Sequence, residues 1–265
     1  MSAPHYFIDT HCHFDFPPFV GEAAASVARA ADHQVRQIIV PAVTADRFDG
    51  VLALADRHDA LFAALGLHPL FITQHNDAAL ARLAAHLKQP PATLVAVGEI
   101  GLDLYMDNPH FERQKALLED QLHLAKQANL PVILHSRRTH DQLFSLLRKQ
   151  ALPATGVVHG FAGSLAQAQA FVKLGYAIGV GGTITYERAQ KTRKTIAALP
   201  LSCLLLETDA PDMPLAGYQG QPNRPERAAQ VFEVLCQLRP EPPETIAAAL
   251  NANTRRVFNL PLLSA

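Results

Sequence analysis

The sequence has few cysteines and no Cys-x-x-Cys motif. Its three cysteines, Cys12, Cys203 and Cys236, are odd in number and far apart, which is unlike the paired spacing of a disulfide framework. A reducing, cytoplasmic setting is therefore the more natural expectation. Residues 1–6 show no basic segment followed by an apolar one, so no signal peptide is expected.

Long apolar runs and an excess of positive charge are also missing. No run approaches the roughly 18–20 residues that a membrane-spanning helix needs, so no membrane association is expected. The formal net charge is -1, whereas proteins that hold nucleic acid by bulk electrostatics normally show a basic excess. This balance still allows an enzyme that grips one or two phosphates locally. No feature of the chain indicates an obligate protein partner.

The composition supplies ample material for a folded core. Of the 265 residues, 49% are hydrophobic and 18% are charged, which argues against disorder. This length suits either two small domains or one α/β barrel of about 250 residues. No Gly/Ser-rich or Pro-rich linker and no internal repeat divides the chain. We therefore expect a single domain over residues 1–265.

Eight short apolar runs punctuate the chain. They are continuous rather than alternating, as expected for strands that are buried on both faces of a parallel sheet. The runs are 6–9, 37–41, 61–68, 94–99, 131–135, 156–159, 176–180 and 203–209. The segments between them have helical character, and this alternation predicts a (β/α)8 TIM barrel. The clearest helix is 108–129, in which we expect Asn108 to cap and Pro109 to take the first position.

Side chains suited to metal binding follow several of these runs. In a barrel the carboxyl ends of the strands form the active face. His11 and His13 would project to one side of an extended strand. Later runs end in a carboxylate or an imidazole, the usual oxygen and nitrogen ligands of a catalytic metal site. The complete set is His11, His13, Glu99, His135, His159 and Asp209.

Six ligands exceed what one ion needs. Because a catalytic zinc ion uses about three protein ligands, the set predicts two divalent ions and hydrolysis by an activated water. Glu99 comes halfway round the rim and could reach both ions. Asp209 could bind one ion and also take the proton of the attacking water. Glu99 and Asp209 are therefore the predicted catalytic residues.

Six short motifs contain or adjoin these residues and run in order from about residue 6 to Phe258. They are His11-Cys12-His13-Phe14-Asp15, Gly66-Leu67-His68-Pro69, Gly98-Glu99-Ile100-Gly101-Leu102-Asp103, His135-Ser136-Arg137, His159-Gly160-Phe161 and Leu206-Glu207-Thr208-Asp209-Ala210-Pro211. Together they resemble the successive signatures of the TatD family of metal-dependent deoxyribonucleases, a branch of the amidohydrolase superfamily.

The resemblance implies a division of the ligands between two ions, which would be Mg, Mn or Zn. Glu99 would bridge them. His11, His13 and Asp209 would hold the first ion, and His135 and His159 the second. It also implies hydrolysis of phosphodiester bonds in DNA that is single-stranded or bound by an end.

The substrate contacts are less closely defined. The resemblance places His68 near the substrate phosphate, although it could equally be a rim histidine without a direct role. Arg137 and Arg224 are the basic residues that we expect at the substrate. The chain departs from the common family pattern on this rim, with Arg138 where an acidic residue is usual and Asn223-Arg224-Pro225 where Asn-Glu-Pro is frequent. His159 is also followed by Gly-Phe-Ala-Gly, where Cys-Phe-Ser/Thr-Gly is common.

Aromatic residues lie just past two strand ends and allow two interpretations. Phe14, Phe16, Phe19 and Tyr105 could stack on exposed bases. They could also pack in the core or under a lid, which is the commoner role.

Other functions stay open at this point. A hydrolase of the same superfamily could act on a small ester, lactone or amide, although many such enzymes carry a modified lysine where this chain has Glu99. A histidinol-phosphatase-like barrel also opens with His-x-His. A non-enzymatic barrel with structural ions is a further alternative, but structural sites are usually closed by four ligands.

Overall fold

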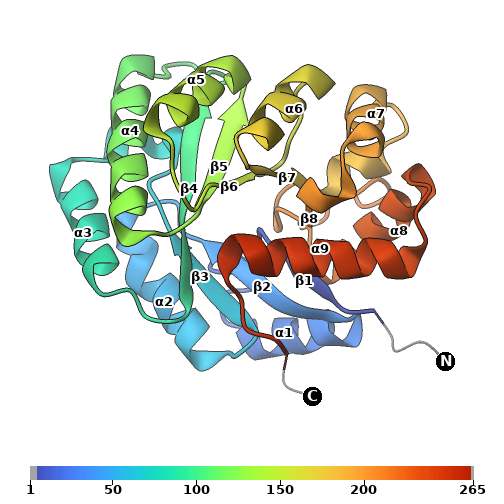
Figure 1. The fold of residues 1–265 in the computed structure, drawn as a ribbon. Coiled ribbons are helices and arrows are strands. Elements are labelled where there is room, and N and C mark those ends of the chain that lie inside the picture. Colours follow the sequence, from blue (N-terminus) through green and yellow to red (C-terminus); the bar gives the residue numbers. More distant parts are fainter. Residues whose placement is uncertain (1–4, 264–265) are drawn as a thin grey trace.

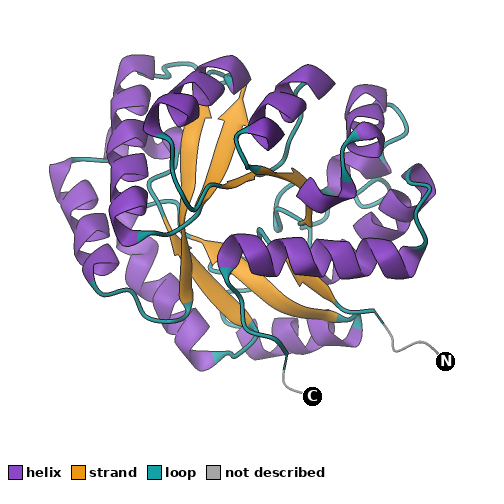
Figure 2. Ribbon diagram, viewed as in Figure 1, coloured by secondary structure: helices purple, strands orange, loops and turns teal. Residues whose placement is uncertain are grey.

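Eight parallel strands pair in chain order, β1 to β8, in the computed structural model, which describes residues 5–263. The strands are β1 (Phe7–Asp9), β2 (Val35–Pro41), β3 (Leu61–Leu65), β4 (Leu94–Asp103), β5 (Val132–Arg137), β6 (Gly156–Val158), β7 (Ala177–Val180) and β8 (Leu204–Leu206). Helices surround them in a ring (Figures 1 and 2). This is a (β/α)8 TIM barrel, as the alternation of apolar runs and helical segments predicts.

The ring of helices follows the strands along the chain. The helices are α1 (Ala23–Asp32), α2 (Phe48–Arg57), α3 (Asp77–Lys88), α4 (Phe111–Ala128), α5 (His140–Gln150), α6 (Leu165–Lys173), α7 (Gln190–Ala198), α8 (Ala228–Leu238) and α9 (Pro243–Phe258). Helix α9 crosses in front of the barrel in Figure 1. None of the helices within residues 5–263 is long and apolar enough to cross a membrane.

All eight predicted strands are present, but the predicted start of the helix over 108–129 is wrong. Helix α4 begins at Phe111, after His110 in the left-handed conformation (φ 44°). The Gln114 side chain explains the late start, because its amide donates to the carbonyl oxygens of Pro109 (2.7 Å) and Asp103 (2.9 Å). These bonds hold the preceding loop against β4. The predicted end is confirmed, since Asn129 is the left-handed C-cap.

The core has two layers. Side chains on one side of the strands pack outward against the helices. Side chains of alternate strand residues fill the barrel interior, as the twofold period of a strand requires. This inner cluster contains Ile8, Ile39, Phe62, Ala64, Val95, Ala96, Ile133, Val157, Ala177, Leu205, Phe258 and Leu260. Phe258 and Leu260 come from the end of α9 and the segment after it, so the last part of the chain helps to fill the barrel interior.

The seam between the last strand and the first is closed by a buried polar network. The Asp9 carboxylate accepts hydrogen bonds from the Thr208 amide (2.9 Å) and hydroxyl (2.6 Å), and the Thr10 hydroxyl donates to the Leu206 carbonyl (2.9 Å). Beyond the strands, Cys12 and Ala210 form a parallel bridge. The backbone segments that carry His-x-His and the aspartate after β8 are thereby held side by side.

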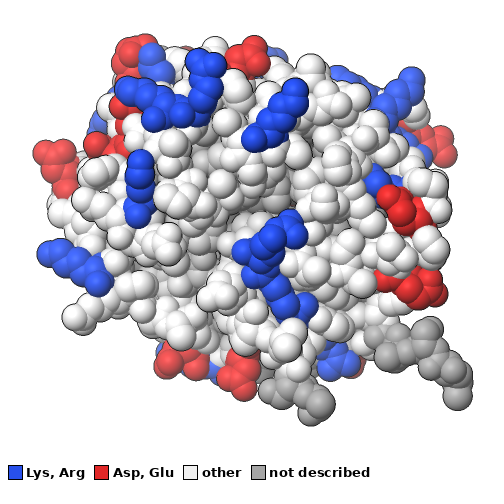
Figure 3. All heavy atoms as spheres, in the orientation of Figure 1, with Lys and Arg blue, Asp and Glu red and all other residues white. Residues whose placement is uncertain are grey.

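Charged side chains lie mainly around the edge of the face seen in Figure 3. One group of basic side chains lies over the carboxyl-terminal half of α9, whose last turn contains Arg255 and Arg256. The face as a whole has no continuous basic stripe, in keeping with the near-neutral net charge.

Two glycines provide a matched test of this packing. Gly156 begins β6 at φ 153°, and a Cβ atom there would lie 2.7 Å from the backbone nitrogen of Val132. Gly156→Ala should therefore lower the free energy of unfolding by about 2 kcal/mol or more. Gly50 is exposed in α2 with open space around it, so Gly50→Ala should raise it by about 0.4–1 kcal/mol. Urea unfolding measures the free energy of unfolding of both variants. An equal change in the two variants would contradict the close packing described at Gly156.

Candidate metal centre

The predicted ligands converge at the carboxyl ends of the strands. A cavity of about 530 Å³ opens there, and residues at or just after the ends of β3 to β8 contribute to its wall. The six predicted ligands meet at its floor, although they come from segments as far apart as residues 11 and 209. The prediction that these side chains share one rim agrees with their positions.

Glu99 is the centre of this group. Its carboxylate is 2% exposed, and its backbone amide donates to the Ala42 carbonyl (3.0 Å), which holds this part of β4 in place. Five imidazoles face its two oxygens. The five are His11, His13, His68, His135 and His159.

Four atoms gather on one side of Glu99. Its Oε2 atom lies 3.1 Å from His11 Nε2 and 3.3 Å from His13 Nε2, and the two nitrogens are 3.2 Å apart. Asp209 Oδ1 lies 3.5 Å from both nitrogens. Atoms that bind one ion at about 2.0–2.2 Å are about 3–3.6 Å from each other. The spacing therefore fits a first divalent ion.

A second set faces the other oxygen of Glu99. Oε1 lies 2.8 Å from His159 Nε2 and 3.1 Å from His135 Nδ1. Two imidazoles and a carboxylate are an accepted ligand set for a catalytic ion that keeps an open position. The donor set thus suits a second divalent ion, with Glu99 between the two.

His68 lies deeper than a residue of the open rim. It is 4% exposed, and its Nε2 atom is 2.9 Å from Glu99 Oε1. His68, Glu99 and His135 form one of the groups whose atoms are close enough to hold an ion. The sequence analysis does not include His68 among the ligands. However, His68 ends an apolar run just as several predicted ligands do, and this position is the signal that could have predicted its contact with Glu99.

Two of the imidazoles are oriented by acceptors on their other nitrogen. His135 Nε2 faces Asp103 Oδ2 at 2.7 Å, and His13 Nδ1 faces the Pro41 carbonyl at 3.2 Å. Such partners set the tautomer of a metal-binding imidazole and strengthen its basicity. Asp103 ends the Gly98–Asp103 motif, so its place in the sequence indicated importance but not this contact.

The protonation of the cluster reflects burial and charge together. Burial lowers the pKa of His11 to about 4. Burial opposes protonation of His159 too, but the nearby Glu99 carboxylate raises its pKa to about 9. Burial alone would raise the pKa of Glu99, yet the surrounding imidazoles hold it well below the usual range. Glu99 is therefore kept ionised in a site from which water is largely excluded.

The two predicted substrate arginines lie differently. Arg137 lines the cavity, and its guanidinium carbon is 3.8 Å from the centre of the Tyr105 ring. The guanidinium carbon of Arg138 lies 4.4 Å from the centre of the same ring. Arg224 is not among the described residues that line this cavity.

The aromatic residues divide between the two interpretations left open by the sequence. Phe14 and Phe19 are fully buried and stack on each other with ring centres 5.0 Å apart. Tyr105 is 50% exposed. Core packing is therefore correct for the two phenylalanines, whereas Tyr105 is half exposed and carries the guanidinium groups of Arg137 and Arg138 over its ring.

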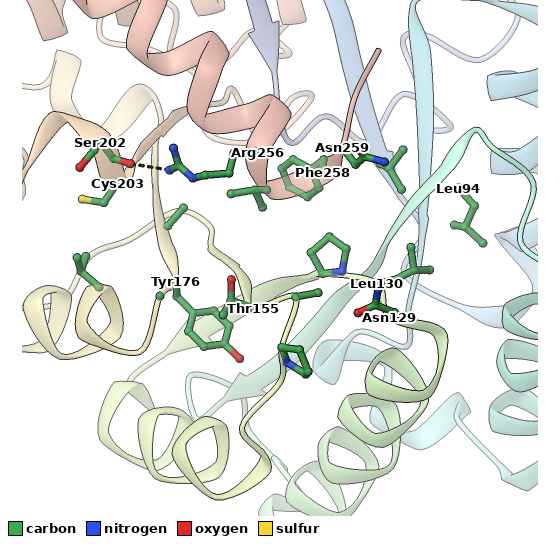
Figure 4. Close-up of a pocket in the computed structure, with 18 of the residues that line it drawn as sticks. Leu94, Asn129, Leu130, Thr155, Tyr176, Ser202, Cys203, Arg256, Phe258 and Asn259 are labelled. Atoms are coloured by element: carbon green, nitrogen blue, oxygen red, sulfur yellow. Dashed lines mark hydrogen bonds between the residues drawn. The ribbon is translucent and has the colours of Figure 1, made fainter. Parts of the chain in front are cut away.

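A second, larger cavity lies at the opposite end of the barrel. Its volume is about 830 Å³, and it is bounded by residues that precede or begin β4 to β8 and by the end of α9. Arg256 donates to the Ser202 carbonyl across one side of it (Figure 4). Its described lining contains no histidine, aspartate or glutamate, so it lacks the metal-binding chemistry of the first cavity.

Comparison with known proteins shows similarity over nearly the whole chain. A family model described as TatD related DNase matches residues 8–259. The chain is 64% identical over 255 residues to "Uncharacterized metal-dependent hydrolase YjjV" of Escherichia coli K12, covering 96% of this chain and 98% of that protein. It is 48% identical over 262 residues to an "Uncharacterized metal-dependent hydrolase" of Haemophilus influenzae, covering 96% and 100%.

A solved structure agrees in fold. The crystal structure of YjjV, described as a TatD homologue from Escherichia coli, superposes with a TM-score of 0.95 at 64% identity and covers 96% of this chain and 98% of that one.

The cluster predicts that divalent ions stabilise the folded chain. Saturating Mn or Zn at about 100 times the dissociation constant should raise the free energy of unfolding by about 2.7 kcal/mol for each site. Glu99→Gln should remove most of this gain because the neutral amide no longer attracts both ions. Thermal unfolding with and without chelator measures it. The matched control Glu119→Gln lies on α4, where Glu119 pairs with Lys149, and it should keep the full gain. A full gain in Glu99→Gln would refute the bridging role.

Proposed function

Because the chain belongs to the TatD family of metal-dependent hydrolases, we propose that it cleaves phosphodiester bonds at the ends of DNA strands with two divalent ions held around Glu99. The observation that carries the proposal is the gathering of five imidazoles and two carboxylates on the floor of an open cavity. Such a group of side chains can hold divalent ions. Those ions would activate a water molecule for attack on an ester and stabilise the negative charge that develops on its oxygens.

The residues divide into two ligand groups. Asp209 joins the His11–His13 pair on one side, His135 and His159 form the other, and Glu99 bridges them. The mixed nitrogen and oxygen donors suit Zn or Mn, and Mg is also possible where oxygen ligands dominate. When bound, the ions would lower the pKa of a water molecule and neutralise charge on the phosphate oxygens.

Asp209 is placed to manage the proton. Its side chain is 22% exposed and lines the cavity, whereas the Glu99 side chain is 2% exposed and enclosed by rings. In the proposed reaction water attacks phosphorus and Asp209 takes the proton that this water loses. The bond from phosphorus to the leaving oxygen breaks, and that oxygen keeps the electron pair and takes up a proton from solvent. Glu99 stays ionised and holds the two halves of the site together.

The mouth of the cavity favours a nucleotide chain as the ester. Leu70 and Met213 line it and are among the few large apolar side chains that are exposed. Arg137 lies beside Tyr105, so a cation and a flat ring are offered together. Single-stranded nucleic acid is commonly bound by such pairs, with bases on apolar or aromatic surfaces and phosphates on cations. A cavity of about 530 Å³ admits a strand end rather than a duplex.

A small ester or lactone is the second candidate substrate, and one observation favours it. Arg137 is the single lysine or arginine among the described residues that line the cavity. An uncharged ester needs no further cation there, whereas a polyanion usually gains from several.

A direct assay separates the two substrates. With Mn or Zn present, the protein should shorten a 3′-labelled single-stranded DNA, and Asp209→Asn should reduce the rate by about 100-fold or more because the proton acceptor is lost. His159→Ala should lower activity through weaker ion binding. A lactone, a phosphomonoester and a simple phosphodiester are assayed in parallel. Turnover of the lactone with intact DNA would refute the proposal.

The two arginines give a second prediction. Arg137→Ala should lower kcat/KM for single-stranded DNA by about 10- to 100-fold, the loss expected for a charge-assisted hydrogen bond to phosphate. Arg224→Ala is the matched control, because this side chain does not line the cavity, and it should change kcat/KM by less than about 3-fold. Steady-state kinetics decide; a larger loss in Arg224→Ala would show that substrate runs along another path.

A further inference from the structure

Two of the proposed ligand imidazoles have no hydrogen-bond partner for their second nitrogen. The other two, His13 and His135, do have such a partner: a backbone carbonyl for His13 and the Asp103 carboxylate for His135. Within residues 5–263, by contrast, the Nδ1 atoms of His11 and His159 are buried and without a partner. An imidazole that binds an ion through Nε2 carries its proton on Nδ1, and a buried N–H needs an acceptor.

Glu207 lies where one acceptor could serve both rings. The His11 and His159 rings stack with centres 3.8 Å apart and planes 12° apart. One nitrogen of each ring and one carboxylate oxygen of Glu207 are all within 4.8 Å of one another. Glu207 Oε1 is 3.8 Å from His159 Nδ1, and Glu207 Oε2 is also buried without a partner.

The fold makes room for this acid at some cost. Glu207 is 1% exposed, and burying a carboxylate is unfavourable unless charge or hydrogen bonds compensate. A Cβ atom at Gly179 in β7 would lie 2.8 Å from Glu207 Oε1, so a residue larger than glycine would collide with the carboxylate. The Gly160 amide donates to the same oxygen. The backbone around β6 and β7 is therefore shaped to receive Glu207.

We propose that Glu207 is a positioning residue that accepts the Nδ1 protons of His11 and His159 and so directs both Nε2 atoms toward the ions. The inference rests on the proposed function of the cluster as a two-ion site. A shift of about 1 Å brings the 3.8 Å separation to the length of a charge-assisted hydrogen bond, about 2.7–2.9 Å. Because His11 serves one ion and His159 the other, a single carboxylate orients a ligand of each.

A third ion is the competing use of the same three side chains. It would have to bind His11 through Nδ1 while Nε2 faces Glu99 and the first ion. The His11 ring would then lose both of its protons, which a neutral imidazole ligand does not require. An acceptor role for Glu207 needs no such step.

The test compares metal affinity with the stability of the metal-free chain. Glu207→Gln should weaken Mn or Zn binding by about 10- to 100-fold in calorimetric titration, the loss usual for partners that orient a ligand. The metal-free variant should unfold at the same or a higher temperature than the parent, because a buried acid with one unpartnered oxygen is replaced by a neutral amide. A purely structural role would instead lower this temperature.

Asp212→Asn is the matched control. Asp212 lines the same cavity and is exposed, and it has no hydrogen bond or ion pair with an imidazole within the described structure. It should weaken ion binding by less than about 3-fold. An equal loss in Asp212→Asn and Glu207→Gln would mean that only the total charge matters, and the inference would be overturned.

Nitrogen-15 NMR of the histidine rings in the ion-loaded parent protein gives an answer that needs no variant. Protons on Nδ1 of His11 and His159 support the inference, and protons on Nε2 overturn it. If the parent binds no ion at all, the proposed function itself fails. If it binds two ions and Glu207→Gln binds them equally well, or if a third ion is found and is lost in Glu207→Gln, only the role given to Glu207 fails.

Discussion

The burial of one carboxylate among five imidazoles is the constraint on which this site depends. Glu99 is almost completely shielded from solvent, yet the rings around it hold it in the ionised form. An isolated buried charge of this kind would be costly, so the cluster is stable only as a set in which cations or protons balance the acids. Divalent ions are the partners that suit its nitrogen and oxygen atoms, and the hydrolase chemistry follows from them.

The seam of the barrel places the two ends of this set. His11 and His13 follow the first strand and Asp209 follows the last, so their meeting depends on closure between β1 and β8. The Asp9 carboxylate makes that closure through the amide and hydroxyl of Thr208. The same bonds that complete the fold therefore assemble one half of the proposed metal centre, and a change at the seam would be felt by both.

In the proposed function, hydrolysis and substrate choice belong to different depths of the cavity. The buried floor holds the groups that can bind ions and move a proton, and these belong to the family motifs. The open rim holds Arg137, Arg138 and Tyr105, and Arg138 is one of the positions at which the chain departs from the common pattern. In the proposed function the floor can act on either ester, so the rim would decide between a DNA end and a smaller substrate. Proteins with the same floor can thus differ in substrate.

The eight strands, the barrel and the family could all be read from the sequence. Buried parallel strands are continuous apolar runs, and the position just after such a run marks one rim whatever the strand, which is why Glu99, His135 and Asp209 were recognised. Side-chain contacts across the barrel were not readable, because they depend on register and depth. The sequence therefore predicts a phosphate contact or an idle rim position for His68 but not its contact with Glu99, and it assigns no role to Asp103 or Glu207. The start of α4 was misplaced because Gln114, not Asn108, organises the loop before it.

The opening His-x-His pair shows the same division. Its sequence determined that two imidazoles leave one strand on the same side, because strand side chains alternate. Only the tertiary structure decided that both Nε2 atoms meet the same oxygen of Glu99, since that requires β1 and β4 to close around a common interior. The chemistry of each residue is local, but the distances that turn six residues into one site are set by barrel closure.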